Sequence, residues 1–209
     1  MKRGTARLAL LAFAATASVS LRESHALAQS ASARRADSAR DGVYDRFDGD
    51  LDLGLALGAE LGSAGHAAPA IRGTAHYFSI AGVYVQGRVH AGDQSARSLF
   101  GLGVDLRPLF VPRWAKGFET GPSFFDLTLD SLSLSLGAFW TERPAHALNA
   151  ARGLEAGLGF GIPLFASAGG PWLETRGALR YPDGGAREEA IFVALSWHGF
   201  VLTPLSAER

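Results

Sequence analysis

The stretch from Asp50 to Gly62, DLDLGLALGAELG, alternates strictly between two kinds of residue. Successive side chains of a β-strand point to opposite faces, so this stretch predicts a strand with one apolar face and one face of small and charged residues. The apolar face carries Leu51, Leu53, Leu55, Leu57, Ala59 and Leu61. The other face carries Asp50, Asp52, Gly54, Ala56, Gly58 and Glu60. One face therefore meets an apolar phase, and the other meets a narrow polar space.

The same alternation recurs along the chain and predicts eight strands, a number that fits the length of the chain. Pro163 ends the sixth segment, and the Asp183-Gly184 pair predicts a tight turn before the last one. The predicted strands occupy residues 50–62, 70–80, 83–92, 98–107, 124–140, 153–162, 172–181 and 189–198. The expected fold class is all-β, an eight-stranded antiparallel transmembrane β-barrel.

Two segments interrupt the pattern. Residues 108–123 contain three prolines and several aromatic residues around Lys116, which predicts an interfacial loop or a short helix. Within 124–140 the leucines change from odd to even positions near Asp130, which predicts a bulge or a short turn at Asp130 and Ser131.

The N-terminal 28 residues have the features of a cleaved secretory signal peptide. Basic residues precede an apolar run of about 14 residues, shorter than the ~20 that a spanning helix needs. Ala26 and Ala28 occupy the small-residue cleavage positions. Residues 29–49 are small, polar and charged without a period, so we expect a flexible periplasmic lead-in. The barrel is expected at 50–200, with periplasmic termini, and a C-terminal tail at 201–209.

Charge and cysteine content exclude several classes. Of the 20 basic and 20 acidic residues, Lys2, Arg3, Arg7, Arg22 and Glu23 fall in the expected signal. The remainder holds 16 basic and 19 acidic residues, a net charge near −3, which argues against a nucleic-acid partner. The chain has no cysteine, hence neither disulfides nor a lipidated cysteine. No segment after the signal has 18 consecutive apolar residues, so a transmembrane helix is not expected there.

The composition of the non-leucine face distinguishes two orientations of the barrel. A soluble barrel exposes a face rich in Lys, Thr, Gln and Glu, whereas this face is mostly Gly, Ala and Ser with single charges. An eight-stranded barrel is just wide enough to be filled by side chains, which favours small and paired charged residues inside and leucine outside. Lone buried charges are costly, so we expect an internal ionic network. Its expected members are Asp52, Glu60, Arg72, Arg88, Asp105, Arg107, Glu155, Glu174 and Arg176.

Aromatic residues at strand ends and in segment 108–123 add to this pattern, since such residues form girdles at membrane interfaces. The expected interfacial residues are Trp114, Trp140, Trp172, Tyr181 and Trp197. With the signal peptide and the eight alternating segments, they make residues 50–200 resemble the small outer-membrane β-barrel proteins of Gram-negative bacteria. The resemblance implies a cell outer-membrane location, with membrane lipid and the barrel assembly machinery as partners. Such barrels commonly end on an aromatic residue, whereas here Phe200 is followed by VLTPLSAER.

Two enzyme types occur among outer-membrane barrels, the lipid A deacylases and the phospholipid-to-lipid A acyltransferases, and both use His and Ser systems. Ser196 and His198 share a strand face and are the weak catalytic candidates, although their order is the reverse of the deacylase pattern and no acidic partner is evident. His76 and Ser79 are expected to face opposite sides. The histidines have no short zinc-ligand spacing, although His76 and His90 lie on neighbouring strands.

The sequence therefore predicts a non-enzymatic outer-membrane barrel with a narrow charged lumen and a structural, adhesive or small-ligand-binding role. Neither cofactor nor metal is expected, and the sequence does not define the oligomeric state. A large porin is not expected, because an open aqueous channel from one chain takes ~16 strands. Two alternatives remain open, an outer-membrane lipid-modifying hydrolase or acyltransferase and a secreted soluble lipid-binding barrel.

Overall fold

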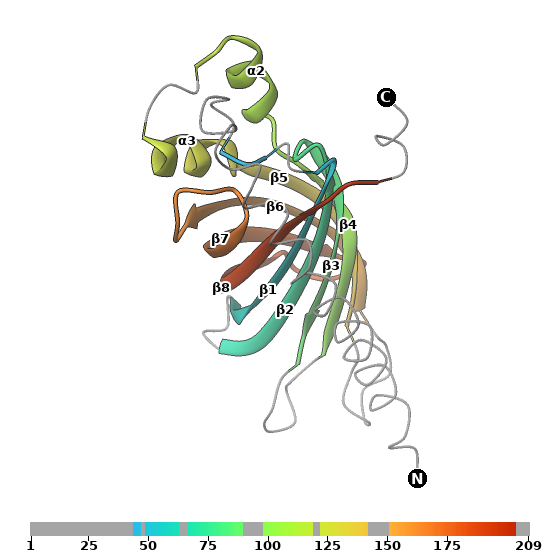
Figure 1. Cartoon of the computed structure of the whole chain (residues 1–209). Coiled ribbons are helices and arrows are strands. Elements are labelled where there is room, and N and C mark those ends of the chain that lie inside the picture. The colour runs from blue at the N-terminus through green and yellow to red at the C-terminus, as the bar shows by residue number, and fades with distance from the viewer. Residues whose placement is uncertain are drawn as a thin grey trace. The chain divides into compact units, whose positions relative to one another are not determined.

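The computed structural model describes residues 44–46, 49–62, 67–89, 98–118, 122–141 and 151–203. Eight antiparallel strands form a closed barrel in chain order, with β8 paired to β1 (Figure 1). The strands are β1 (Leu51–Gly62), β2 (Ala67–Tyr77), β3 (Ala81–Arg88), β4 (Leu99–Leu106), β5 (Ser133–Thr141), β6 (Ala151–Pro163), β7 (Gly170–Pro182) and β8 (Glu188–Val201). The predicted eight-stranded antiparallel barrel is therefore confirmed. The expected signal peptide lies outside the described residues.

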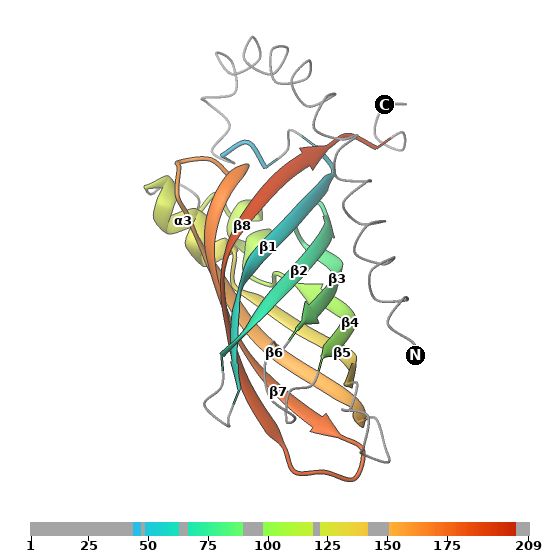
Figure 2. The ribbon, with the colours of Figure 1, turned by 90° about the horizontal axis from the view of Figure 1, so that it is seen from below.

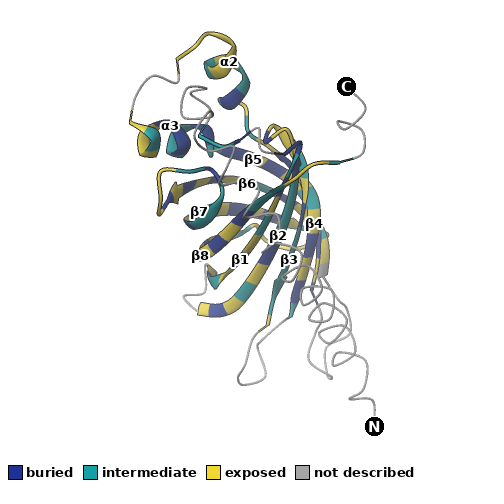
Figure 3. Cartoon of the chain, in the orientation of Figure 1, coloured by how far each residue is buried: buried dark blue, intermediate teal, exposed yellow. Residues whose placement is uncertain are grey.

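The alternation in the sequence becomes the two faces of the barrel wall. Along most strands, inward residues are more buried than their outward neighbours, and the difference appears as successive bands in Figure 3, although β3 has Tyr84 as its one buried residue. The leucines of β1 point outward, while Asp52, Ala56 and Glu60 are buried inside. A small apolar cluster of Ala56, Phe192 and Ala194 lies within the wall, but most of the interior is polar.

The two ends of the barrel differ. We call the terminal end the one where β1 begins and β8 finishes. It also holds the turn 78–80, the connection 107–132 and the connection 164–169. The opposite end, the hairpin end, holds the turn 183–187 between β7 and β8. The Asp183-Gly184 turn is formed as predicted, with a positive φ of 76° at Gly184.

The connection 107–132 forms two helices, α2 (Phe110–Ala115) and α3 (Ser123–Asp130). Figures 1 and 2 show α3 at the terminal end beside the connection between β6 and β7. The short helix expected within 108–123 is present as α2. The expectation that 124–130 belongs to a strand is wrong, because these residues form α3, and β5 starts only at Ser133 after a turn at Ser131. No helix in the described part of the chain is long and apolar enough to cross a bilayer.

Two glycines make room for a large side chain inside the barrel. Gly103 of β4 and Gly137 of β5 are directly opposite each other, and the ring of Tyr84 lies against both. A Cβ atom at Gly137 would overlap with Tyr84 Oη and with the carbonyl oxygen of Leu102. Glycine at this pair therefore lets a buried tyrosine cross the lumen.

Replacing Gly137 by alanine is expected to lower the free energy of unfolding by about 1–3 kcal/mol, because the added methyl group forces Tyr84 from its position. The matched control is Gly177→Ala, where a new Cβ meets no described atom within 4 Å. We expect the control to leave stability unchanged or to raise it by up to about 1 kcal/mol. Urea unfolding followed on unboiled gels measures both, and equal stability of the two variants would contradict close packing at Gly137.

Candidate functional site

The lumen is the candidate site, because the inward faces of the strands gather charged side chains, most of them buried and three of them, Arg88, Arg107 and Glu174, partly buried. Five arginines point into it together with five carboxylates. The arginines are Arg72, Arg88, Arg107, Arg176 and Arg180, and the carboxylates are Asp52, Glu60, Asp105, Glu155 and Glu174. The two signs balance, which is the condition for placing so many charges in a narrow interior.

Arg180 of β7 is the centre of the network toward the hairpin end. Its Nη1 and Nη2 donate to the two carboxylate oxygens of Glu60 at 2.7 Å each, and its Nε donates to Glu155 at 2.6 Å. Arg88 adds a second donor to Glu60 at 2.6 Å. One guanidinium thus bridges carboxylates from β1 and β6, in the paired geometry that gives the strongest charge-assisted hydrogen bonds.

A tyrosine and a glutamine connect this network to the next. Glu155 accepts hydrogen bonds from Tyr84 Oη at 3.2 Å and from Gln86 Nε2 at 2.9 Å. The Arg72 guanidinium lies 3.8 Å from the centre of the Tyr84 ring and donates to Gln86 Oε1 at 3.1 Å. The aromatic face and the amide stabilise Arg72 without requiring a further carboxylate.

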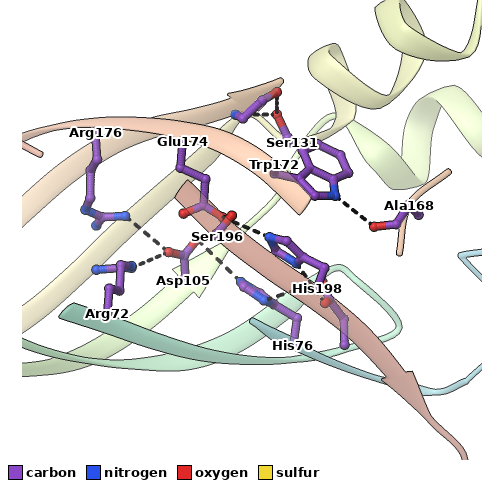
Figure 4. Close-up of polar contacts among 12 residues, drawn as sticks. Arg72, His76, Asp105, Ser131, Ala168, Trp172, Glu174, Arg176, Ser196 and His198 are labelled. Atoms are coloured by element: carbon purple, nitrogen blue, oxygen red, sulfur yellow. Dashed lines mark hydrogen bonds and ion pairs between the residues drawn. The ribbon is translucent and has the colours of Figure 1, made fainter. Parts of the chain in front are cut away.

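Asp105 of β4 occupies the middle of the lumen between two arginines. Its Oδ2 accepts from Arg72 at 2.7 Å and from Arg176 at 3.2 Å, as Figure 4 shows. His76 lies 3.7 Å from the other oxygen of Asp105 and 3.9 Å from Asp52. These two distances exceed hydrogen-bond length.

Toward the terminal end, a second histidine is held by two carboxylates. His198 Nδ1 lies 3.0 Å from Asp52 Oδ1, and its Nε2 lies 2.8 Å from Glu174 Oε1. Arg107 donates to Asp52 at 2.7 Å. With a carboxylate oxygen at each ring nitrogen, the geometry suits an imidazolium that donates at both positions.

Ser196 and His198, the weak catalytic candidates, lie close together but do not form a nucleophile and base pair. Ser196 Oγ donates to Glu174 Oε1 at 2.7 Å, the same oxygen that His198 contacts (Figure 4). The described contacts include no hydrogen bond between Ser196 and the His198 ring. Glu174 is the acidic partner that was not evident in the sequence, but it lies between the Ser196 hydroxyl group and the His198 ring. A nucleophile requires its base within hydrogen-bond reach.

A small cavity lies among these groups. Its volume is about 50 Å³, and Asp52, His76, Asp105, Trp172 and His198 are among its lining residues. Since a cavity needs about 10–15 Å³ to hold one water molecule, this cavity has room for a few of them.

The helices α2 and α3, with residues 116–118 that follow α2, are together called the cap, and they lie at the terminal end. Leu127 of α3 is fully buried against Ala168 and Trp172. Arg113 of α2 donates to Asp130 at 2.8 Å and also to Asp126. Burial alone would lower the pKa of Arg113, but the carboxylates of Asp130 and Asp126 outweigh it and raise that pKa.

The chain segments just before β1 and just after β8 also make contacts at the terminal end. Tyr44 Oη donates to Asp126 at 2.8 Å, and Arg46 lies 3.6 Å from Asp130. After β8, Thr203 donates a backbone and a side-chain hydrogen bond to Asp50. The side-chain bond in particular lowers the pKa of Asp50. Within the expected lead-in 29–49 the structure describes 44–46 and 49, and Tyr44, Asp45 and Arg46 contact the barrel domain; the rest of 29–49 lies outside the described residues.

The structure places the expected lumen residues together, each paired as above, and places four of the five expected interfacial aromatics on the outside. Trp114, Trp140, Tyr181 and Trp197 are all 44% exposed or more. Trp172 does not lie on the outside, where it was expected. It is only 5% exposed, its Nε1 donates to Ala168 O at 3.0 Å, and its ring lies 5.3 Å from that of His198. It fills the lumen beneath the cap.

Two further expectations need revision. Ser79 is buried like His76 and lines the same cavity, because the chain leaves β2 at Tyr77 and turns with positive φ at Phe78 and Ser79. The expectation of opposite sides is therefore wrong. The partner considered for His76, His90, lies outside the described residues, and β3 ends at Arg88 rather than at 92.

Sequence reasoning missed Arg180, Tyr84 and Gln86. Arg180 has the same parity as Glu174 and Arg176 in β7, so the alternation itself contained the signal for it. Tyr84 and Gln86 likewise share the parity of Arg88 in β3, so the alternation places them on the inward face, but it does not indicate that they contact Glu155. Within the described residues, no group of three His, Cys, Asp or Glu side chains is arranged to hold a metal ion.

No family model and no curated protein matches the sequence. Among solved structures, the chain is similar to the N-terminal β-barrel domain of OprF from Pseudomonas aeruginosa, with 9% sequence identity and a TM-score of 0.45. The match covers 72% of this chain and 98% of that chain. At this identity and TM-score, no property of OprF transfers to this chain.

Proposed function

We propose that this chain is a non-enzymatic outer-membrane barrel whose closed lumen does not conduct ions and whose role is structural. The observation that carries the proposal is the outer face of the wall. Among the described outward-facing strand residues, charges occur only at Arg152 and Glu189, and both lie at the hairpin end. Elsewhere this face consists of aliphatic, aromatic and small residues, with Thr175 as the one polar side chain.

The dimensions of this apolar outer face, which we call the apolar belt, support a location of the barrel in a bilayer. The exposed apolar residues of β8 run from Ile191 to Val201. At about 3.3 Å per residue this is about 33 Å along the strand, and about 25 Å of height at a tilt of about 40°. That height equals the apolar band of transmembrane barrels. In water, a continuous apolar belt of this size would be an aggregation surface.

The side chains that fill the interior support the proposal that the lumen is closed. The side chains of Arg180, Glu155 and Tyr84 meet across the barrel and are fully buried. The remaining cavity holds only a few waters. Carboxylate contacts at both Ser196 and His198 favour a structural role for these residues as well.

Fractionation of cells that express the full chain tests the location. We expect the protein in the outer-membrane fraction, and we expect its gel migration to change on boiling because the folded barrel resists detergent. Recovery from the aqueous periplasmic or secreted fraction would overturn the proposal. In planar bilayers we expect no stable conductance steps, and regular steps would contradict a closed lumen.

The enzymatic alternative has a direct test in the same cells. We expect Ser196→Ala and His198→Ala to leave lipid A and phospholipid composition unchanged relative to the unsubstituted chain. Loss of a lipid product that the unsubstituted chain generates, with the barrel still heat-modifiable, would overturn the non-enzymatic assignment.

A further inference from the structure

The outer surface of the cap is unusually aromatic for a connection between strands. Trp114 and Phe118 in and after α2 are 48% and 59% exposed, and Phe124 and Phe125 of α3 are 47% and 61% exposed. All four belong to one connection between strands, and exposed large apolar residues that form a continuous patch mark an interaction surface.

The two carboxylates of α3 point the other way. Asp126 and Asp130 lie four residues apart on one helix face, and both are buried against Arg113. Among the described residues of the cap, the exposed charge is Lys116, whose ammonium lies 6.0 Å from the ring of Phe118. The cap is therefore amphipathic, with carboxylates inward and aromatics plus one lysine outward.

The aromatic surface continues into the belt of the barrel. Beyond the outward residues Phe160 and Ile162 of β6, the chain exposes Leu164 and Phe165, the latter 63% exposed, in the connection 164–169. Both views show this connection beside α3 (Figures 1 and 2). Apolar exposure thus extends from the wall to the cap without an intervening charged residue in the described 160–168 segment.

We propose that the outer surface of the cap, formed by Trp114, Phe118, Phe124, Phe125 and the adjoining Phe165, lies in the headgroup region of the bilayer leaflet at the terminal end of the barrel. The partner is a phospholipid surface, and the inference rests on the proposed membrane location of the barrel. Aromatic side chains favour this boundary, and Lys116 reaches lipid phosphates there. The cap then both covers the lumen and fixes the depth of the barrel in the membrane.

Single-cysteine labelling tests the proposal cleanly because the chain has no cysteine. We would place one cysteine at Phe125 in the cap, at Leu57 in the middle of β1, or at Ala186 in the hairpin turn, each exposed. The full chain, folded into phosphatidylcholine and phosphatidylglycerol vesicles, carries an environment-sensitive fluorophore at that position. Quenchers are a nitroxide on the lipid headgroup, a nitroxide deep in the acyl chain, and iodide in water. Heat-modifiable migration verifies folding of each variant.

We expect loss of fluorescence at Phe125→Cys with the headgroup nitroxide, at Leu57→Cys with the deep nitroxide, and at Ala186→Cys with iodide. A label at Phe125→Cys that responds to iodide alone, while Leu57→Cys responds to the deep nitroxide, would overturn the interfacial cap and leave the membrane barrel standing. That result would make the cap a surface for water or for another protein. An iodide response at Leu57→Cys in the folded protein would instead refute the proposed function itself. Phe165→Cys provides a second position, and its disagreement with Phe125→Cys would also overturn the proposal.

Discussion

Replacing Arg180 by methionine is expected to lower the free energy of unfolding by about 3–5 kcal/mol, the usual consequence of removing one partner from a buried ion pair. The guanidinium provides three hydrogen bonds to Glu60 and Glu155. Without it, Glu155 keeps only the neutral donors Tyr84 and Gln86, and its charge stays in the interior. Urea titration in vesicles, followed by loss of the unboiled gel form, measures the change.

Two comparisons show whether the unpaired charge is the cause. Arg152 pairs with Asp183 at 3.2 Å, but both side chains are about 70% exposed or more, so Arg152→Ala should change stability by less than about 1 kcal/mol. Adding Glu155→Gln to Arg180→Met removes the orphaned charge, and we expect the double variant to be more stable than the single one. A double variant that is weaker still would show that Arg180 acts through its packing instead.

The strand pattern of this chain was predictable because the two faces differ so strongly in hydrophobicity. Leu51 to Leu61 in β1 and Ile191 to Leu195 in β8 keep a period of two without a break, and this period alone defines which side chains enter the lumen. The pairs within the lumen were not predictable. Arg180 of β7 meets Glu60 of β1 past the intervening strand β8 because of the register and closure of the whole sheet, which the local sequence does not encode.

The helix α3 shows where the pattern is ambiguous. In FFDLTLD, Leu127 and Leu129 alternate with polar residues as in a strand, yet Asp126 and Asp130 also have the spacing of one helix face. Contacts from Arg113 and Tyr44 to those carboxylates favour the helix, and both contacts come from distant parts of the sequence. Trp172 is a different case. Its parity matched Glu174 and Arg176 and thus indicated the lumen, but its position near a strand end suggested a membrane interface.

A charge placed in the middle of the outer belt distinguishes a membrane barrel from a soluble one. Leu136 of β5 is 58% exposed at mid-strand, and Leu202 is 60% exposed just beyond β8. In vesicles, Leu136→Arg should lower the free energy of unfolding by about 2–4 kcal/mol, because the guanidinium lies near the bilayer midplane, whereas Leu202→Arg should cost about 0–1 kcal/mol near the interface.

A barrel surrounded by water would give a different result. Both leucines are exposed to a similar extent, so arginine at either position would be solvated and would change stability by about 0.5 kcal/mol or less. The difference in the free energy of unfolding between the two arginine variants therefore reports the depth of each position in the bilayer and not its exposure. Equal and small effects at Leu136 and Leu202 would show that the leucine face contacts water, and the apolar belt would then need a protein partner to cover it.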